Sequence, residues 1–261
     1  MSELFTFPII DTHTHLCDPV FDADRKEVLR RAGDAGIVSI LIVGENIEDA
    51  EKNLTLSHEY SMLAPLAGLY PAILDIDCAE KIIAFIGEHR EKLVGIGEVG
   101  LDFWAVQEAH QKDLQKEIFH RFIALSKEVN LPLNVHSRSA GRHAVDLLLR
   151  EGAKRVQLHA FDGKGATALP AIEAGYFFSI PPSIVHSRQK KKFVKSLPLS
   201  CLLLETDSPV LGPVPGQRNE PKYILDSVDA IAEIKGISRE EVIETTYHNT
   251  LRLYGDVVLQ Q

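Results

Sequence analysis

Ile9-Ile10-Asp11-Thr12-His13-Thr14-His15 stands near the start of a chain of 261 residues, and this stretch decides the fold. An apolar pair runs directly into a polar segment, and seven further apolar runs end at a polar or glycine cluster in the same way. Each run is followed by a segment whose apolar residues have helical spacing, and this alternation is typical of a parallel β/α protein. The eight runs are Ile9-Ile10, Ser39–Val43, Leu66–Leu69, Val94–Gly97, Pro132–Val135, Arg155–Leu158, Tyr176–Ser179 and Cys201–Leu204.

The runs are continuously apolar rather than alternating in polarity, which is the pattern of parallel strands buried on both faces. Helical spacing extends over residues near 107–130, ahead of Pro132, and again near 222–235 and 238–254. The last of these segments opens with the capping box Ser238–Glu241. The spacing therefore predicts helices between the strands and two more after the eighth strand.

No low-complexity linker divides the chain, so we predict one domain over residues 1–261. Eight β/α units in a chain of this length most simply close into a single (β/α)8 TIM barrel of the α/β class. A doubly wound open sheet is the alternative arrangement of the same units.

Charge and composition exclude several classes of protein. The 28 Lys and Arg residues face 37 Asp and Glu residues, and the net charge of -9 argues against a protein that coats nucleic acid. A phosphate ester can still be a substrate where bound metal ions supply the positive field. Neither a signal peptide nor an apolar run of about 18 residues is present, so we expect an intracellular protein, cytoplasmic, nuclear or both, that is neither secreted nor membrane-bound. We expect a monomer without an obligate protein partner.

Metal-ligating side chains gather where the apolar runs stop, which is where a barrel places its reactive residues. His13 and His15 lie two residues apart, so both can face the barrel mouth from one strand. Four imidazoles and two carboxylates suffice to hold two divalent cations when one carboxylate bridges them, and such ligands accept Zn, Mn or Mg. The six residues are His13, His15, Glu98, His136, His159 and Asp207.

Six segments carry a resemblance to a known family: Asp11–His15, Ile96–Phe103, Val135–Arg138, Leu158–Gly163, Glu205–Pro209 and Arg218–Pro221. In this order they resemble the motifs of the TatD family of metal-dependent deoxyribonucleases. The resemblance spans essentially the whole chain and implies a barrel of the metal-dependent hydrolase type.

The resemblance also implies a role for each ligand. His13, His15, Glu98 and Asp207 would hold the first ion, and Glu98 would bridge to a second ion held by His136 and His159. A water between the ions would be the nucleophile, with Asp207 as its general base. The substrate implied is DNA. Because a pocket at a barrel mouth admits a strand terminus more readily than a duplex, we expect a single strand or a frayed end.

Two departures from the family pattern weaken the inference of DNA more than the inference of a hydrolase. The family usually has Gly-x-His-Pro after its third strand, whereas this chain has Gly68-Leu69-Tyr70-Pro71. The phenol of Tyr70 therefore stands where a histidine can contact a substrate phosphate. The segment Ala160-Phe161-Asp162 replaces the usual Cys-Phe-Ser and places a carboxylate near an anionic substrate.

Other side chains are candidates for substrate binding or for orienting the ligands. Arg138 and Arg218 are the cations placed to meet a phosphate, and Asp102 and Glu205 can orient ligands or water. Each has an alternative interpretation as a surface or loop-tying residue. The basic run Arg188–Lys192 can track a nucleic-acid strand, although such runs are more often solvated helix faces. Trp104, beside Phe103, can stack a base at the mouth or cap the barrel.

Two other functions remain open at this level. A two-metal amidohydrolase would use the same ligands to cleave a small C–N, ester or lactone bond. A non-catalytic binding module would keep the fold alone, but the complete set of six ligands argues against it. The sequence leaves the metal, the polarity of cleavage and the choice between exo and endo action undetermined.

Overall fold

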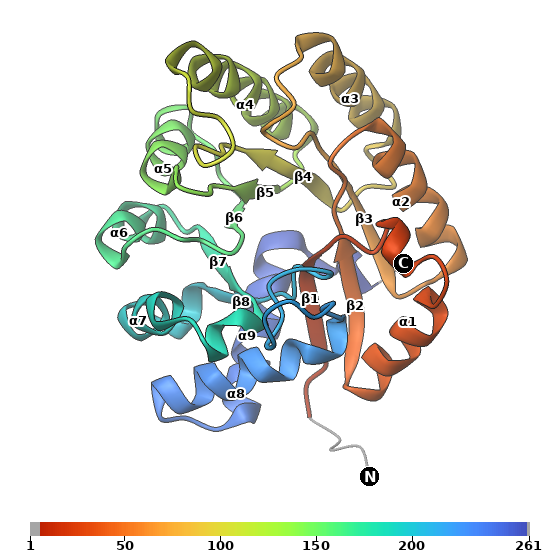
Figure 1. The fold of residues 1–261 in the computed structure, drawn as a ribbon, viewed down its shortest axis with the longest axis vertical. Helices are drawn as coiled ribbons and strands as arrows, with labels where there is room; N and C mark the ends of the chain where they lie inside the picture. Colours follow the sequence, from red (N-terminus) through yellow and green to blue (C-terminus); the bar gives the residue numbers. More distant parts are fainter. Residues whose placement is uncertain (1–5, 260–261) are drawn as a thin grey trace.

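The computed structural model describes residues 6–259, and eight parallel strands form its centre in the sequential order β1 to β8 (Figure 1). The strands are β1 (Ile9–Thr14), β2 (Ile37–Ile42), β3 (Leu63–Ala67), β4 (Gly95–Gly100), β5 (Leu133–His136), β6 (Val156–Leu158), β7 (Phe177–Ile180) and β8 (Leu202–Leu204). Each pair of neighbouring strands from β1–β2 to β7–β8 is parallel. The predicted (β/α)8 barrel is confirmed.

Helices follow the strands and surround them in Figure 1. They are α1 (Arg25–Asp34), α2 (Ile47–Glu59), α3 (Ile76–His89), α4 (Ala109–Val129), α5 (Gly141–Arg150), α6 (Gly165–Glu173), α7 (Arg188–Ser196), α8 (Ile224–Lys235) and α9 (Arg239–Tyr254). Short 3-10 turns span Pro19–Phe21, Pro182–Val185, Leu199–Cys201, Pro221–Tyr223 and Asp256–Leu259. The expected cap of α9 is present, because the Ser238 hydroxyl accepts the Glu241 N–H at 3.1 Å. None of the described helices combines the length and the apolar character that crossing a membrane requires.

The ring closes between β8 and β1 at the carboxyl ends of these strands. The Asp207 N–H donates to the His13 carbonyl at 2.9 Å, and the His15 N–H donates to the Ser208 carbonyl at 2.8 Å. Deeper in the barrel, the Thr12 hydroxyl donates to the Leu204 carbonyl at 2.9 Å. These bonds fix the segment that carries Asp207 against the segment that carries His13 and His15.

The third strand is displaced from the sequence-based expectation at both of its ends. The third apolar run was expected at Leu66–Leu69, but β3 begins three residues earlier, and its Leu63 pairs with Ile40 of β2. The strand ends before Gly68, where a Cβ would lie 2.5 Å from the Glu98 carbonyl oxygen. Such an approach excludes any side chain, so Gly68 and Leu69 form the loop that leads to the site.

The barrel interior changes from apolar to polar along the strands. Ile10, Phe177 and Leu203 belong to an apolar cluster that Leu253 and Tyr254 of α9 complete. Two residues further along the same three strands stand Thr12, Ser179 and Glu205, and all three are buried. Because side chains two residues apart share one face of a strand, a polar layer lies above the apolar layer and beneath the mouth.

Candidate metal centre

The six predicted ligands meet at the carboxyl end of the barrel, around a cavity of about 490 Å³. Five of them line the cavity, and the sixth, His13, is fully buried beneath it. Their nitrogen and oxygen atoms form three overlapping groups, each with atoms within 4.8 Å of one another. Strands β1, β4, β5, β6 and β8 bring them together from positions up to 194 residues apart, from His13 to Asp207.

Glu98 lies at the centre of the cluster, and each of its oxygens faces a different pair of imidazoles. Its Oε2 lies 3.5 Å from the Nε2 of His13 and 3.3 Å from the Nε2 of His15. Its Oε1 lies 2.5 Å from the Nδ1 of His136 and 3.4 Å from the Nε2 of His159. One carboxylate therefore stands between two sets of nitrogen donors, as a bridging ligand must.

Asp207 completes the set on the side of His13 and His15. Its Oδ1 lies 3.5 Å from the Nε2 of His13 and 3.4 Å from the Nε2 of His15. Its backbone has a left-handed φ of 54°, a conformation in which aspartate is enriched among non-glycine residues. The closing bond to the His13 carbonyl and a bond from the Val210 N–H hold this conformation.

The other nitrogen of two imidazoles donates to an oxygen, which directs the first nitrogen to the centre. The Nδ1 of His13 lies 2.8 Å from the Oδ1 of Asn134. The amide of Asn134 is oriented by its own donation to the Thr12 carbonyl at 2.9 Å, so its oxygen faces His13. The Nε2 of His136 lies 3.0 Å from the Oδ2 of Asp102. Protons held on these outer nitrogens leave a lone pair on each inner nitrogen, as metal ligation requires.

The remaining two imidazoles face carboxylates at longer range. The Nδ1 of His15 lies 3.8 Å from Glu45, and the Nδ1 of His159 lies 3.9 Å from the Oε2 of Glu205. The His159 nitrogen is buried and has no hydrogen-bond partner among the described residues. Glu205 is held in place by the Ser179 hydroxyl at 2.6 Å and by the Ala160 N–H at 2.8 Å. All four imidazoles thus have an oxygen behind them.

The electrostatics of the cluster favour bound positive charge. Burial raises the pKa of Glu98, but the surrounding imidazoles outweigh burial and hold that pKa well below its usual range. The pKa of Asp207 is also lowered, against burial, by His15 and His13. Burial opposes a charge on His136, yet Glu98 and Asp102 raise the pKa of His136 to about 10. Two ionised carboxylates in a buried site match the charge of divalent cations, so the donor set fits such ions.

Tyr70 and Asp102 form a connected pair on the wall of the cavity. The Tyr70 hydroxyl donates to the Oδ2 of Asp102 at 2.9 Å, and this oxygen also faces His136. The other oxygen of Asp102 accepts the N–H groups of Trp104 and Ala105. Burial raises the pKa of Asp102, but the bond to His136 and the other donors lower it to about 2. Tyr70 therefore lines the cavity and also fixes the carboxylate that orients His136.

Arg138 also lines the cavity, as the sequence predicts for a substrate-binding cation. Its guanidinium carbon lies 3.7 Å from the ring centroid of Trp104, whose side chain is 60% exposed. A large exposed indole in contact with a side chain that lines the polar cavity offers an apolar face for stacking.

Arg218 lies away from the cavity, which differs from the expectation that it contacts a substrate phosphate. Its guanidinium forms two bonds to Asp24, at 2.9 and 2.6 Å, and a third to Glu220 at 3.2 Å. Two carboxylates thus hold the guanidinium of Arg218. The motif that contains Arg218 supports the backbone rather than contacting the substrate. The next residue, Asn219, donates at 2.7 Å to the Thr206 and Val210 carbonyls and so supports the loop of Asp207.

The structure adds three residues that the sequence did not single out: Asn134, Glu45 and Lys190. Asn134 lies inside an apolar run of the sequence. The only local sign of its role is that a polar amide stands in a strand expected to be buried. Lys190 belongs to the basic run 188–192, but it points into the metal cavity while its neighbours do not. Burial lowers the pKa of Lys190, and the charges of Glu205 and Asp207 oppose that shift.

Comparison with known proteins identifies the relatives of this chain. The family model described as TatD related DNase matches residues 10–255. Deoxyribonuclease TATDN3 of Homo sapiens is 45% identical, over 94% of this chain and 94% of that protein. The uncharacterized metal-dependent hydrolase YabD of Bacillus subtilis (strain 168) is 36% identical, over 94% of this chain and 98% of that protein. The resemblance to the TatD family, and within it to the vertebrate TatD domain-containing protein 3, is confirmed.

A solved structure shares the fold. The crystal structure of YjjV, a TatD homolog from Escherichia coli K12, matches with a TM-score of 0.88 at 27% sequence identity. The match covers 94% of this chain and 97% of that chain.

Proposed function

The chain belongs to the family of TatD-related DNases and is a metal-dependent hydrolase, and from this premise we propose that it hydrolyses phosphodiester bonds of DNA with two divalent cations. The preferred substrate in this proposal is a single strand or a frayed end. The named deoxyribonuclease relative supports it, and so do the two cations, Arg138 and Lys190, that line the cavity.

The observation that carries the proposal is the position of Glu98 between two pairs of imidazoles. In this arrangement His13, His15, Glu98 and Asp207 would hold one ion. The other side of Glu98, with His136 and His159, would hold the second. When bound, two such ions would lower the pKa of a coordinated water and stabilise charge on the phosphoryl oxygens.

The protein's own residues then supply binding and proton transfer. Asp207 is ionised and faces the cavity, so it accepts the proton of the attacking water. Lys190 and Arg138 line the same cavity and place positive charge near the scissile phosphate. Asp102 and Asn134 hold two of the imidazoles in the ligating orientation. No covalent nucleophile is needed.

The rim of the cavity favours a strand end over a duplex. A cavity of about 490 Å³ holds roughly one nucleotide beside the ions. The exposed indole of Trp104, with Arg138 over its ring, offers a surface on which an unpaired base stacks. Inside a duplex both faces of each base are already stacked on neighbouring base pairs, so a single strand or a frayed end fits better.

The proposal is tested by hydrolysis of a 3′-labelled single-stranded DNA oligomer with Mg, Mn and Zn in turn. A small carboxylic ester and a lactone serve as parallel substrates. We expect metal-dependent cleavage of the oligomer and little turnover of the other two. Turnover of the ester or lactone with intact DNA would instead establish the alternative function, a two-metal amidohydrolase-type enzyme.

Asn134 provides a first prediction about the imidazole orientation. Asn134→Ala removes the oxygen that holds the Nδ1 proton of His13, so we expect metal affinity to fall by about 10- to 100-fold. The change is measured by competition with a chelator of known affinity, with circular dichroism to confirm the fold. Asn134→Asp keeps the accepting oxygen and should lose less affinity. Unchanged affinity in Asn134→Ala would show that this bond does not orient the ligand.

A further inference from the structure

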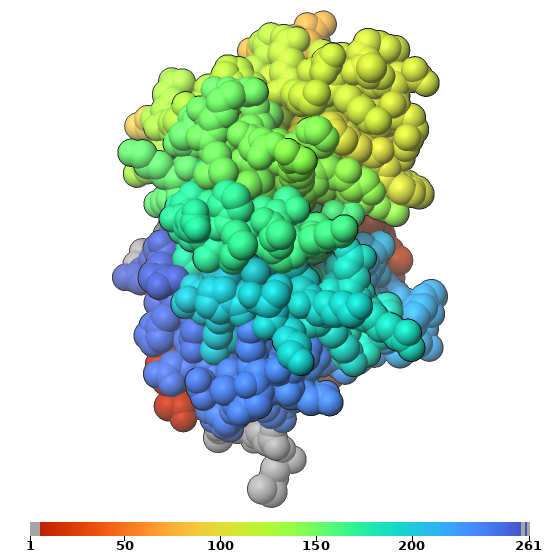
Figure 2. Space-filling view, turned by 90° about the vertical axis from the view of Figure 1, so that its left-hand side faces the viewer, coloured from red at the N-terminus to blue at the C-terminus, as the bar shows by residue number. Residues whose placement is uncertain are grey.

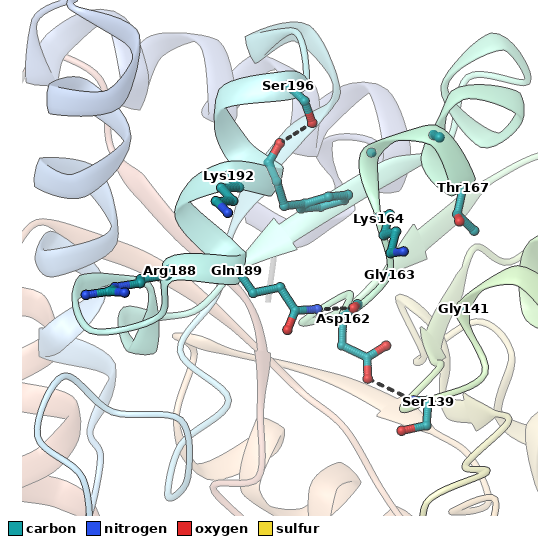
Figure 3. A pocket seen from close by; sticks show the side chains of 13 residues that line it. Ser139, Gly141, Asp162, Gly163, Lys164, Thr167, Arg188, Gln189, Lys192 and Ser196 are labelled. Atoms are coloured by element: carbon teal, nitrogen blue, oxygen red, sulfur yellow. Dashed lines mark hydrogen bonds between the residues drawn. The ribbon is translucent and has the colours of Figure 1, made fainter.

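A second and larger cavity, of about 1000 Å³, lies beside the metal cavity, among the first turns of α5 and α6 and along α7 (Figure 3). Figure 2 shows these helices stacked on one outer face of the molecule, in green, teal and cyan. We call this cavity the basic groove, because Lys164, Arg188 and Lys192 line it.

The basic groove continues directly from the metal cavity. Asp162 lines both cavities, and three segments of chain pass from one to the other. Ser139 follows Arg138, Gly163 follows Asp162, and α7 presents Lys190 to the metal cavity and Lys192 to the groove. A polymer whose end lies at the metal centre can therefore extend outward along the basic groove.

The charge of the groove is opposite to that of the protein as a whole. Residues 163–200 contain six Lys and Arg residues and a single acidic residue, Glu173, in a chain of net charge -9. Within residues 6–259, Lys164, Arg188 and Lys192 make no ion pair. These three cations are thus available to an anionic ligand. Asp162, at the junction with the metal cavity, is the one carboxylate among the residues that line the groove.

The walls of the groove are held in place by close contacts. A Cβ on Gly165 would lie 2.5 Å from the Ser196 hydroxyl, so glycine lets the first turn of α6 pack on the last turn of α7. The Asp162 carboxylate accepts the Ser139 N–H at 2.8 Å, and its carbonyl accepts the Gln189 side chain (Figure 3). The floor includes Phe193, which packs against Phe161 and Phe178 of the core. The cations thus stand on a fixed frame.

We propose that the basic groove binds the phosphodiester backbone of a single-stranded polynucleotide, beyond the nucleotide that occupies the metal cavity. The placement of the strand end at the metal centre rests on the proposed function. Unpaired cations along a groove that leads away from such a site suit the repeated negative charges of a strand. The substrate class is then an oligomer several nucleotides long, in preference to a mononucleotide or a dinucleotide.

Binding of a 20-nucleotide labelled single-stranded DNA, measured by fluorescence anisotropy in EDTA, tests the groove without hydrolysis. The test variant is Lys164→Gln/Lys192→Gln, which removes one cation from each side of the groove. The matched control is Lys191→Gln/Lys195→Gln, which removes the same charge from α7 at positions outside the lining.

Each phosphate contact on a single strand contributes about 0.7 to the slope of log affinity against log salt. For two lost contacts we expect the slope to fall by about 1.4 and affinity at about 0.1 M salt to fall roughly 20-fold. The control variant should change affinity by about threefold or less. Equal losses in both variants, no loss in either, or no binding by the parent protein would overturn the proposal. Competition by inorganic phosphate at the same phosphate concentration would also overturn it, because that identifies a site for a single anion.

A hydrolysis arm separates this proposal from the proposed function. With metal added, Lys164→Gln/Lys192→Gln should lower kcat/KM on the 20-nucleotide strand and leave a dinucleotide unaffected. Equal loss on both substrates would overturn the role of the groove while leaving phosphodiester hydrolysis intact. Failure of the parent protein to cleave either substrate would overturn the proposed function, whereas binding in EDTA would still decide whether the groove holds a strand.

Discussion

Replacing Asp207 by Ala should lower kcat for single-stranded DNA by about ten-thousand-fold at saturating metal. The variant loses a carboxylate whose Oδ1 lies 3.5 Å and 3.4 Å from the inner nitrogens of His13 and His15. It also loses the group that accepts the proton of the attacking water, and positioned general bases alone contribute about 100- to 10,000-fold. Single-turnover hydrolysis of the labelled oligomer measures the effect.

Two further variants isolate the role of Asp207. Asp207→Asn keeps the shape of the side chain but accepts a proton poorly, so it should bind metal better than Asp207→Ala and remain nearly inactive. Asp146→Asn removes an exposed carboxylate on α5 and should leave kcat unchanged. An Asp207→Asn variant that retained most of the parent activity would contradict the assignment of the base.

The second large effect is expected at Glu98. Glu98→Gln should lower the metal content from the proposed two ions per chain to one or fewer and kcat/KM by more than about a thousand-fold. The reason is that both oxygens of one buried carboxylate, 2% exposed, face donor nitrogens on opposite sides. An amide offers one weakly donating oxygen and an N–H₂ group that repels a cation. Inductively coupled plasma mass spectrometry on the purified protein gives the metal content.

The control for Glu98 is Glu45→Gln, a change at a half-exposed carboxylate 3.8 Å from the outer nitrogen of His15. This variant should keep both ions, although it loosens one imidazole and should weaken metal affinity by less than Asn134→Ala does. If Glu98→Gln retained two ions with parent affinity, Glu98 would not be the bridge.

The barrel could be predicted because each strand has a recognisable pattern in its own stretch of sequence. The continuous apolar runs and the helical spacing between them are set by burial on both faces of a parallel sheet. The third strand was predicted to end two residues too late because Leu69 extends the apolar run beyond Gly68. Only the approach of the Glu98 backbone, which no local pattern reveals, ends the strand there.

The ligand set could be predicted for a related reason, since strand order alone brings the carboxyl ends of β1, β4, β5, β6 and β8 to one mouth. The contacts that orient these ligands could not be predicted from the sequence. Asn134 meets His13 across 121 residues of sequence, and only the assembled barrel brings them together. Arg218 was expected at the substrate because its charge is visible in the sequence, whereas its partner Asp24 stands 194 residues away. Lys190 was hidden within a run of similar residues that face the solvent or the basic groove.

Anomalous diffraction from crystals grown with manganese tests the two-ion centre most directly. We expect two peaks, one on each side of the Glu98 carboxylate. The first should be ligated by His13, His15 and Asp207, and the second by His136 and His159. A single peak, or peaks that do not share Glu98, would contradict the two-ion centre.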